Sequence, residues 1–308
     1  MSLPVSLPRG ASSRSPSAPG RPGLKPHASR FLAACGSVLN RGTERLSALA
    51  GKMAWLRLRY LDFAPRPDDL FIVTYPRSGT TWMQMILYQL ATDGNLDFDH
   101  IYQVCPYFET SRGMNNGFAG VPEPRTFKSH LAYRHIPKGC KYLYVSRDGK
   151  DVAVSYFHFS RSHLGFRGTL DEFFDLFMRA RVEAGSWFEH VKGWWAHRHD
   201  PNVLFLRYED LLHDLERSLY RIAAFCDLEI ELARLPAILD RCSFAFMKAH
   251  ESKFDHTLGM LWERGMQPNA FIREGRAGAG KGALSSQQQA RFDRAIRKRL
   301  RQASSDLA

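Results

Sequence analysis

The sequence lacks several features that would assign it to a common protein class. No apolar run approaches the length of about 20 residues that a membrane-spanning helix needs. Its five cysteines are widely spaced without a C-x-x-C pair, which argues against a disulfide scaffold or zinc site and favours a reducing compartment, the cytoplasm. The patterns G-x-S-x-G, H-E-x-x-H and G-x-G-x-x-G are absent. We therefore expect no transmembrane segment and no metal site.

Acidic residues are scarce at both ends of the chain. Residues 1–60 carry ten Lys or Arg and one acid, Glu44, and residues 291–308 carry six basic and two acidic residues. The stretch between them is balanced, with 27 basic and 28 acidic side chains. The basic pI of 9.6 therefore does not indicate nucleic-acid binding by the body of the protein, and we expect no nucleic-acid partner.

Composition divides the chain into four parts. Residues 1–30, rich in Pro, Ser, Gly and Arg, are predicted to be a disordered basic leader, either an organelle transit peptide or a leader without an address. Residues 31–60 form a predicted amphipathic helical segment that either packs on the body or contacts a membrane surface. Residues 61–290 form the main domain, and residues 291–308 a basic C-terminal helix or tail.

Short apolar runs alternate with turns and helical patterns in the main domain. Leu70–Thr74, Tyr142–Ser146 and Val203–Arg207 each read as a buried strand that is followed by a turn and a helix. This alternation predicts a single α/β domain with a central, mostly parallel sheet flanked by helices. Ligands of such sheets bind beyond the carboxyl ends of the strands, where the three turns meet.

The first of these turns has the position of a P-loop-like phosphate-binding loop. Within Thr74–Thr81, Gly79 and Thr81 match G-x-x-x-x-G-K-[ST], and Arg77 supplies a positive charge. Thr80 stands where the motif has lysine, which argues against magnesium-ATP chemistry and hence against a P-loop kinase. A connection that binds no ligand is the remaining interpretation of the loop alone.

The residues Tyr75–Trp82 resemble the 5′-phosphosulfate loop of the cytosolic-type sulfotransferases. These enzymes transfer a sulfuryl group from 3′-phosphoadenosine 5′-phosphosulfate (PAPS) to a hydroxyl or amine. Most of them carry lysine where this chain has Arg77, which keeps the charge but changes its geometry. The resemblance implies that Arg77, Ser78, Gly79, Thr80 and Thr81 hold the 5′-phosphate and sulfate, and that Trp82 stacks on the adenine.

Further motifs of the family follow in order. Tyr144–Tyr156 resembles its 3′-phosphate element, in which Arg147 and Ser155 would bind the phosphate that distinguishes PAPS from ATP. The other cofactor contacts that the resemblance implies are Tyr208 in Tyr-Glu-Asp, Ser243 and Phe244 in Cys-Ser-Phe, and Arg273 and Gly275 in the late motif.

The family's K-[TS]-H motif is present at Lys128-Ser129-His130. The resemblance implies that His130 is the general base that removes the acceptor's proton, a role that suits an imidazole near neutral pH. Lys128 would stabilise charge on the transferring sulfuryl group, and Arg77 would assist the leaving phosphate. This chemistry requires no metal, and the acceptor would be a small hydroxylated molecule.

The late motif departs from the family pattern. Glu274, Ala279 and Gly280 replace its lysine, aspartate and tryptophan. A carboxylate beside a 3′-phosphate lowers cofactor affinity unless a cation such as Arg276 compensates. The surrounding glycines indicate a mobile lid. Only Lys281 matches the family's dimer signature, so we do not predict the family dimer.

Two groups of side chains stay ambiguous from the sequence. Tyr107, Phe108, Phe118 and Tyr133 either line an acceptor pocket or belong to the core, and His197 and His199 are interpreted as a solvated helix end. The sequence as a whole predicts a PAPS-dependent sulfotransferase. The alternative is a non-catalytic nucleotide- or membrane-binding protein on the same fold.

Overall fold

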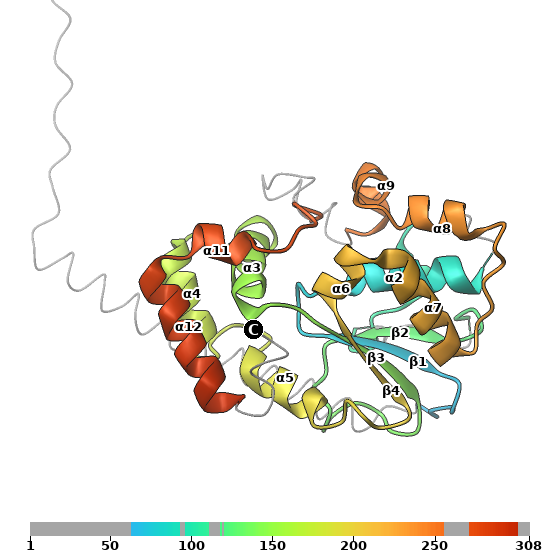
Figure 1. Ribbon diagram of the computed structural model, residues 1–308, viewed down its shortest axis with the longest axis horizontal. Helices are drawn as coiled ribbons and strands as arrows, with labels where there is room; N and C mark the ends of the chain where they lie inside the picture. Colours follow the sequence, from blue (N-terminus) through green and yellow to red (C-terminus); the bar gives the residue numbers. More distant parts are fainter. Residues whose placement is uncertain (1–62, 93–95, 111–117, 119, 256–270, 301–308) are drawn as a thin grey trace, which may run out of the picture. The chain divides into compact units, whose positions relative to one another are not determined.

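A parallel sheet with the strand order β2-β1-β3-β4 lies at the centre of the computed structural model (Figure 1). The structure describes residues 63–92, 96–110, 118, 120–255 and 271–300. The strands are β1 (Leu70–Thr74), β2 (Thr126–Ser129), β3 (Lys141–Ser146) and β4 (Val203–Arg207). All described residues belong to one unit, residues 48–308. The predicted leader 1–30 and helical segment 31–60 lie outside the described residues.

The strand register brings the carboxyl ends of all four strands to one edge. Leu70 of β1 pairs with Thr126 of β2 on one side and with Lys141 of β3 on the other. Tyr142 of β3 pairs with Val203 of β4. The three strands predicted from apolar runs are confirmed, and β2 adds a fourth that carries Lys128.

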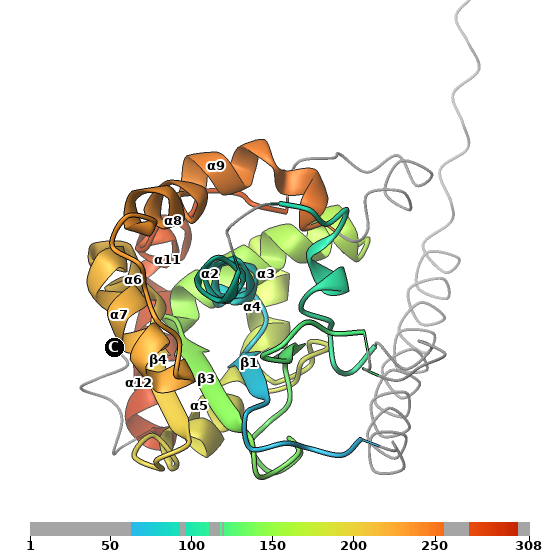
Figure 2. The same cartoon turned by 90° about the vertical axis from the view of Figure 1, so that its right-hand side faces the viewer.

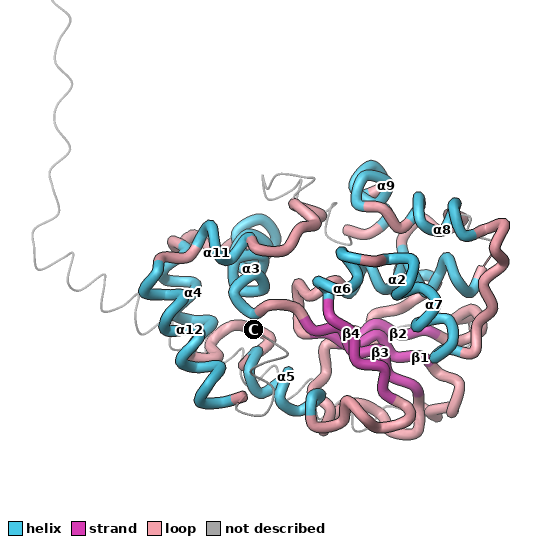
Figure 3. Tube along the Cα trace, viewed as in Figure 1, coloured by secondary structure: helices cyan, strands magenta, loops and turns pink. Residues whose placement is uncertain are grey.

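Helices cover both faces of the sheet, as the tube in Figure 3 shows. The α-helices are α2 (Thr80–Ala91), α3 (Gly149–His163), α4 (Leu170–Met178), α5 (Trp187–Trp195), α6 (Tyr208–His213), α7 (Leu215–Cys226), α8 (Leu235–Arg241), α9 (Phe244–Ala249), α11 (Ala279–Ala283) and α12 (Ser286–Arg299). Two 3₁₀ turns, η1 (Ile101–Gln103) and η2 (Glu251–Lys253), complete the described elements. This arrangement confirms the predicted α/β class. None of the described helices has the length and apolar character needed to cross a membrane.

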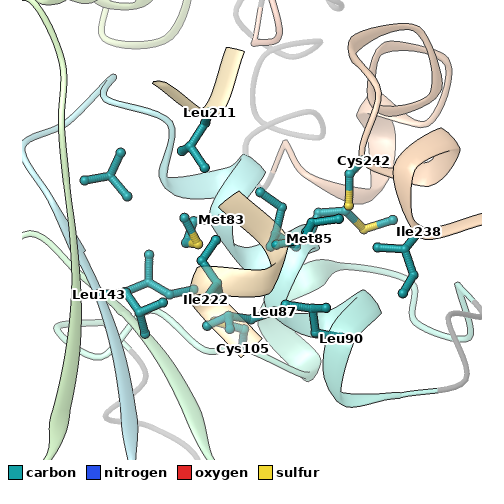
Figure 4. Close-up of a cluster of buried hydrophobic side chains, with 14 of the residues drawn as sticks. Met83, Met85, Leu87, Leu90, Cys105, Leu143, Leu211, Ile222, Ile238 and Cys242 are labelled. Carbon is teal, nitrogen blue, oxygen red and sulfur yellow. The ribbon is translucent and has the colours of Figure 1, made fainter. Parts of the chain in front are cut away.

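Apolar packing fixes the helix that follows the phosphate loop. Met83 and Leu87 of α2 are buried against Leu143 of β3 and Ile222 of α7 (Figure 4). In Figure 2 helix α2 is seen nearly end-on beside β1. Because α2 starts at Thr80, directly after the loop, its packing also sets the direction of its amino terminus.

The late glycine-rich segment is packed against α3 (Figures 1 and 2). The carboxylate of Asp151 accepts hydrogen bonds from the backbone N–H groups of Gly278 (2.8 Å) and Gly280 (2.7 Å). A Cβ atom at Gly280 would approach the carbonyl carbon of Lys150 to 2.6 Å. The family's tryptophan at this position would therefore require a different backbone path.

Helix α12 continues the main domain rather than starting after it. It begins at Ser286, whose predecessor Ser285 caps it, and its Phe292 and Ile296 are buried among aromatic side chains of α4 and α5. The proposed division between residues 290 and 291 falls inside this helix, and residues 301–308 lie outside the described residues.

Candidate active site

The loop between β1 and α2 has an unusual backbone. Arg77 adopts a left-handed φ of 72° and Gly79 a φ of 95°. A Cβ atom at Gly79 would lie 2.8 Å from Cδ2 of Tyr208, so the ring of Tyr208 closes one side of the loop. A non-glycine residue in this conformation is strained, and such strain concentrates at functional sites. The loop ends at the amino terminus of α2, a favourable place for an anion.

Arg77 is half-buried and forms no salt bridge with a carboxylate among the described residues. Its Nη2 donates to the carbonyl of Phe271 (2.7 Å) and its Nε to Ser155 Oγ (3.4 Å). Its guanidinium lies over the rings of Phe159 and Phe271, 4.8 and 5.2 Å from their centroids. Burial and then the nearby Arg147 and Arg273 lower the pKa of Arg77 to about 10. An anion bound here would supply the missing counter-charge.

Two further arginines lie beside this loop. Arg147 follows β3 and donates to the carbonyls of Arg77 (3.1 Å) and Arg276 (3.0 Å). Its guanidinium lies 4.5 Å from the ring centroid of Tyr208. The buried donors Nε of Arg147, Nε of Arg273 and Oγ of Ser78 have no hydrogen-bond partner in the part of the chain that the structure describes. Because buried polar groups are normally paired, the two arginine Nε donors fit a ligand with several phosphate oxygens.

The adenine side of the predicted cofactor site is aromatic. Trp82 Nε1 donates to the carbonyl of Cys242 (2.7 Å), and its ring meets that of Tyr208 edge to face at 5.5 Å. Ser243 caps α9 through the N–H of Phe246. Phe244 packs on Gly275, where a Cβ atom would lie 2.1 Å from its ring. Glycine is therefore the only residue type at position 275 that leaves the Phe244 ring in this place.

The departure at Glu274 has a structural compensation. Its carboxylate forms ion pairs with Arg273 and with Nε of Arg276, the latter at 2.7 Å. The hydrogen bond from Arg276, aided by the charge of Arg273, lowers the pKa of Glu274. The carboxylate is thus charged and is shared between two arginines, one of which is a predicted cofactor contact.

The predicted catalytic residues lie at the carboxyl end of β2. The Nδ1 atom of His130 lies 2.9 Å from the carbonyl oxygen of Thr74, so Nδ1 carries the proton and Nε2 has the lone pair. Burial and the charge of Lys128 hold the pKa of His130 well below its usual value. Lys128 Nζ donates to Tyr102 OH (2.6 Å), and burial lowers the pKa of Lys128 to about 8.

Sequence reasoning missed several side chains around His130. The N–H of His130 donates to Oε1 of Glu109 (2.6 Å), and Nε2 of His190 donates to the carbonyl of His130 (3.2 Å). Tyr102 contacts Lys128 from the 3₁₀ turn η1. None of these residues belongs to a short motif, and each lies 21 to 60 positions from its partner. Local spacing therefore gave no signal for them.

One cavity of about 1510 Å³ brings the predicted residues together. Its lining includes Arg77, Gly79, Thr80, Thr81, Trp82, Lys128, His130, Arg147, Ser155, Tyr208, Ser243, Phe244, Arg273 and Gly275. Ser78 is the one predicted site residue that does not line the cavity, because it is buried within the loop at 1% exposure.

The ambiguous aromatic residues divide between cavity and core. Tyr107 and Tyr133 line the cavity, whereas Phe108 and Phe118 pack with the buried Phe71 and Phe127 in the core. His197 lies just beyond the end of α5 and its side chain is 35% exposed, in agreement with its interpretation as part of a solvated helix end. His197 also lines the cavity, where it pairs with Asp200 and lies against Tyr133. His199 is exposed.

Comparison with known proteins decides the family. Residues 67–304 match the family model described as the sulfotransferase domain. The chain belongs to the sulfotransferase family. This confirms the predicted family and with it a PAPS-dependent transferase rather than a P-loop kinase.

Members of the family align over most of the chain. Amine sulfotransferase of Oryctolagus cuniculus is 34% identical over 252 residues, which are 78% of this chain and 83% of that protein. Sulfotransferase 1C2 of Homo sapiens is 34% identical over 254 residues, 77% and 85% of the two chains. The crystal structure of mouse sulfotransferase SULT7A1 complexed with PAP (adenosine 3′,5′-bisphosphate) superposes with a TM-score of 0.66 at 28% identity, covering 80% of this chain and 88% of that one. Retinol dehydratase in a complex with retinol and PAP gives a TM-score of 0.67 at 26% identity, covering 77% and 82%.

Proposed function

We propose that this protein transfers a sulfuryl group from PAPS to a hydroxyl or amine of a small acceptor, with His130 as the general base. The convergence of Arg77, Arg147 and Arg273 on the cavity that contains His130 carries this proposal. The unpartnered buried donors Arg147 Nε and Arg273 Nε support the binding of a ligand with two phosphate groups. Sulfotransferase SULT7A1 and retinol dehydratase, which share this fold, contain PAP in their crystal structures.

We assign the two ends of the cofactor to two groups of residues. Arg77, Gly79, Thr80 and Thr81, with Ser78 beneath them, would hold the 5′-phosphosulfate at the start of α2. The 3′-phosphate would be bound by Arg147, Ser155 and Arg273, while the adenine would stack on Trp82, close to Tyr208, Ser243, Phe244 and Gly275. PAPS supplies the activated sulfuryl group in this site.

The proton transfer follows from the tautomer of His130. Because Nδ1 donates to Thr74, Nε2 is the atom that accepts the proton of the acceptor's hydroxyl or amine as its oxygen or nitrogen bonds to sulfur. The lowered pKa keeps the imidazole neutral before it accepts that proton. Lys128 and Arg77 are cations on the same cavity and would stabilise the charge that develops on the sulfuryl and leaving phosphate oxygens.

The acceptor would bind on the side of the cavity lined by Tyr107, Leu131, Tyr133 and His197. A retinol dehydratase crystal structure contains androsterone, and another contains retinol, both small molecules with a hydroxyl group. A small hydroxylated acceptor therefore fits the proposal. Four expectations stay predictions: a reaction without a metal, no nucleic-acid partner, peripheral membrane contact through the amino-terminal segment, and a cytoplasmic location. The four described cysteines, which are free and buried, agree with a reducing compartment.

The proposal is tested by the thermal stability of the protein with PAP, ADP and magnesium-ATP. PAP at a hundred times its dissociation constant should raise the free energy of unfolding by about 2.7 kcal/mol. ADP should stabilise the protein less because it lacks the 3′-phosphate. In a separate assay the protein should transfer the ³⁵S-labelled sulfuryl group of PAPS to 4-nitrophenol or 2-phenylethylamine. A preference for magnesium-ATP would contradict the proposal. Selective PAP binding without turnover over a broad acceptor panel would support the non-catalytic alternative.

Replacing Glu274 by glutamine should raise the affinity for PAP. In the native protein Arg273 is shared with the Glu274 carboxylate, which also repels a 3′-phosphate. We expect Glu274→Gln to bind PAP about three- to tenfold more tightly at low salt, the size of a partly screened charge effect. Calorimetric titration measures this, with ADP as the control ligand whose affinity should stay unchanged. Equal gains for PAP and ADP would place the carboxylate away from the 3′-phosphate.

A further inference from the structure

The peptide groups on both sides of the His130 side chain are held by two titratable residues, Glu109 and His190. The N–H of His130 donates to Glu109 Oε1 at 2.6 Å, and its carbonyl accepts from His190 Nε2 at 3.2 Å. The ring itself donates to the carbonyl of Thr74 at 2.9 Å. Three segments far apart in the sequence thus fix the position of one imidazole.

Backbone pairing at the sheet edge places Glu109 beside His130. Lys128 N donates to Pro106 O (2.9 Å) and Phe108 N to Lys128 O (2.8 Å), so residues 106–108 run alongside β2. The chain then turns, which brings Glu109 next to the residue that follows β2. Glu109 is half-buried, but its Oε2 atom is buried and has no hydrogen-bond or salt-bridge partner within the described ranges. Burial raises its pKa to about 7. Burying a carboxylate in this way is costly, which argues that its position matters.

His190 lies on α5 and is held in a single tautomer. Its Nε2 donates to His130, so its Nδ1 accepts from Tyr144 OH at 3.0 Å. Burial lowers the pKa of His190 to about 4, and the ring is therefore neutral at physiological pH. A neutral donor fixes the carbonyl of His130 without adding a charge near the reacting atoms.

We propose that Glu109 and His190 are positioning residues for the general base His130. This inference rests on the proposed role of His130. Charged or titratable groups from each neighbouring segment act on this cluster. In addition to the effect of burial, the Glu109 charge raises the pKa values of Lys128, Tyr102 and Tyr107. Cys105 also raises the pKa of Lys128, and Arg77 lowers it. His190 lowers the pKa of His130.

Two substitutions of Glu109 separate its contributions. Glu109→Ala removes the acceptor of the His130 N–H and should lower kcat by about 10- to 100-fold, the cost of a misplaced catalytic group, with PAP affinity unchanged. Glu109→Gln keeps a carbonyl oxygen for this N–H and should recover most of the activity. Because the carboxylate stabilises the Lys128 ammonium, its loss lowers the pKa of Lys128. The alkaline limb of the kcat profile in Glu109→Gln should therefore move to lower pH.

His190 is tested by the same logic. His190→Gln retains an N–H donor and should keep more activity than His190→Ala. The matched control is Glu216→Ala, which changes an exposed carboxylate on α7 and should leave kcat and its pH profile unchanged. Unchanged kcat in Glu109→Ala, or equal losses of kcat and PAP affinity, would each overturn the proposal.

A spectroscopic measurement separates this inference from the proposed function. The ring nitrogen signals of ¹⁵N-labelled His130, assigned by their loss in His130→Asn, should show the Nδ1–H tautomer in the native protein and in Glu109→Gln. In Glu109→Ala they should show averaging between the tautomers. A native ring spectrum in Glu109→Ala would refute the positioning role. If the native protein transfers no sulfuryl group but the ring signals respond as expected, the proposed function fails and the positioning role stands.

Discussion

Replacing His130 by asparagine should lower kcat by about 10²- to 10⁴-fold, the range that a general base contributes. The asparagine amide can still donate to the carbonyl of Thr74 in place of Nδ1, so the loop stays satisfied. It has no atom in the place of Nε2 to take the acceptor's proton. The affinity for PAP should stay unchanged, because the cofactor contacts proposed here come from the loop after β1 and from Arg147 and Arg273.

Steady-state kinetics and calorimetric titration with PAP measure these two quantities for His130→Asn. The matched control is His199→Ala, which removes an exposed histidine and should behave as the native protein does. A His130→Asn variant with native kcat would remove the proposed base. Parallel losses of turnover, PAP binding and thermal stability would instead assign His130 a structural role.

Replacing Arg147 by alanine should weaken PAP binding much more than ADP binding. Hydrogen bonds to a charged group contribute about 1.5–3 kcal/mol, so the loss for PAP should be about 10- to 150-fold. ADP lacks the 3′-phosphate and should lose only what Arg147 contributes by supporting the carbonyls of Arg77 and Arg276. Arg147→Lys keeps the charge without the planar fork, so its affinity for PAP should lie between those of the native protein and Arg147→Ala.

The ratio of the PAP and ADP dissociation constants is the measured quantity for Arg147. Arg167→Ala, which removes an exposed arginine outside the cavity, is the control. Because Arg147 also lies 3.6 Å from Asp151, a melting curve of each variant checks that the fold is retained. Equal losses for PAP and ADP would refute the assignment of Arg147 to the 3′-phosphate.

The sequence predicted those parts of the fold and site that depend on neighbours along the chain. The run Leu70–Thr74 and the turn after it specify β1 and the loop by local chemistry alone, because an apolar β-branched run and a glycine at positive φ are local requirements. Lys128 and His130 were found because their short motif is contiguous. The same holds for Arg147 and Ser155, which the start of α3 brings to one cavity.

Long-range partners could not be predicted in this way. Nothing local distinguishes Tyr107, which lines the cavity, from Phe108, which is in the core, since the difference arises from the bridge that aligns residue 107 with Lys128. The same applies to Glu109 and His190, whose partner His130 lies on another element. Glu274 was identified as a departure, but its ion pairs with two arginines depend on the path of the backbone.

The bonds from Gly278 and Gly280 to Asp151 also bear on the order in which the site is completed during synthesis. The residues joined by the Gly280 bond are 129 positions apart, and the carbonyl of Arg276, bound by Arg147, belongs to the same late stretch. A ribosome makes the phosphate loop and Arg147 long before Arg273. Because contacts between distant residues form only after the loop between them has closed, the growing chain has half a nucleotide site for much of its synthesis. Binding of the cofactor can therefore stabilise the folded protein only at the last stage of folding, once the stretch around Arg273 has been made and has docked on α3.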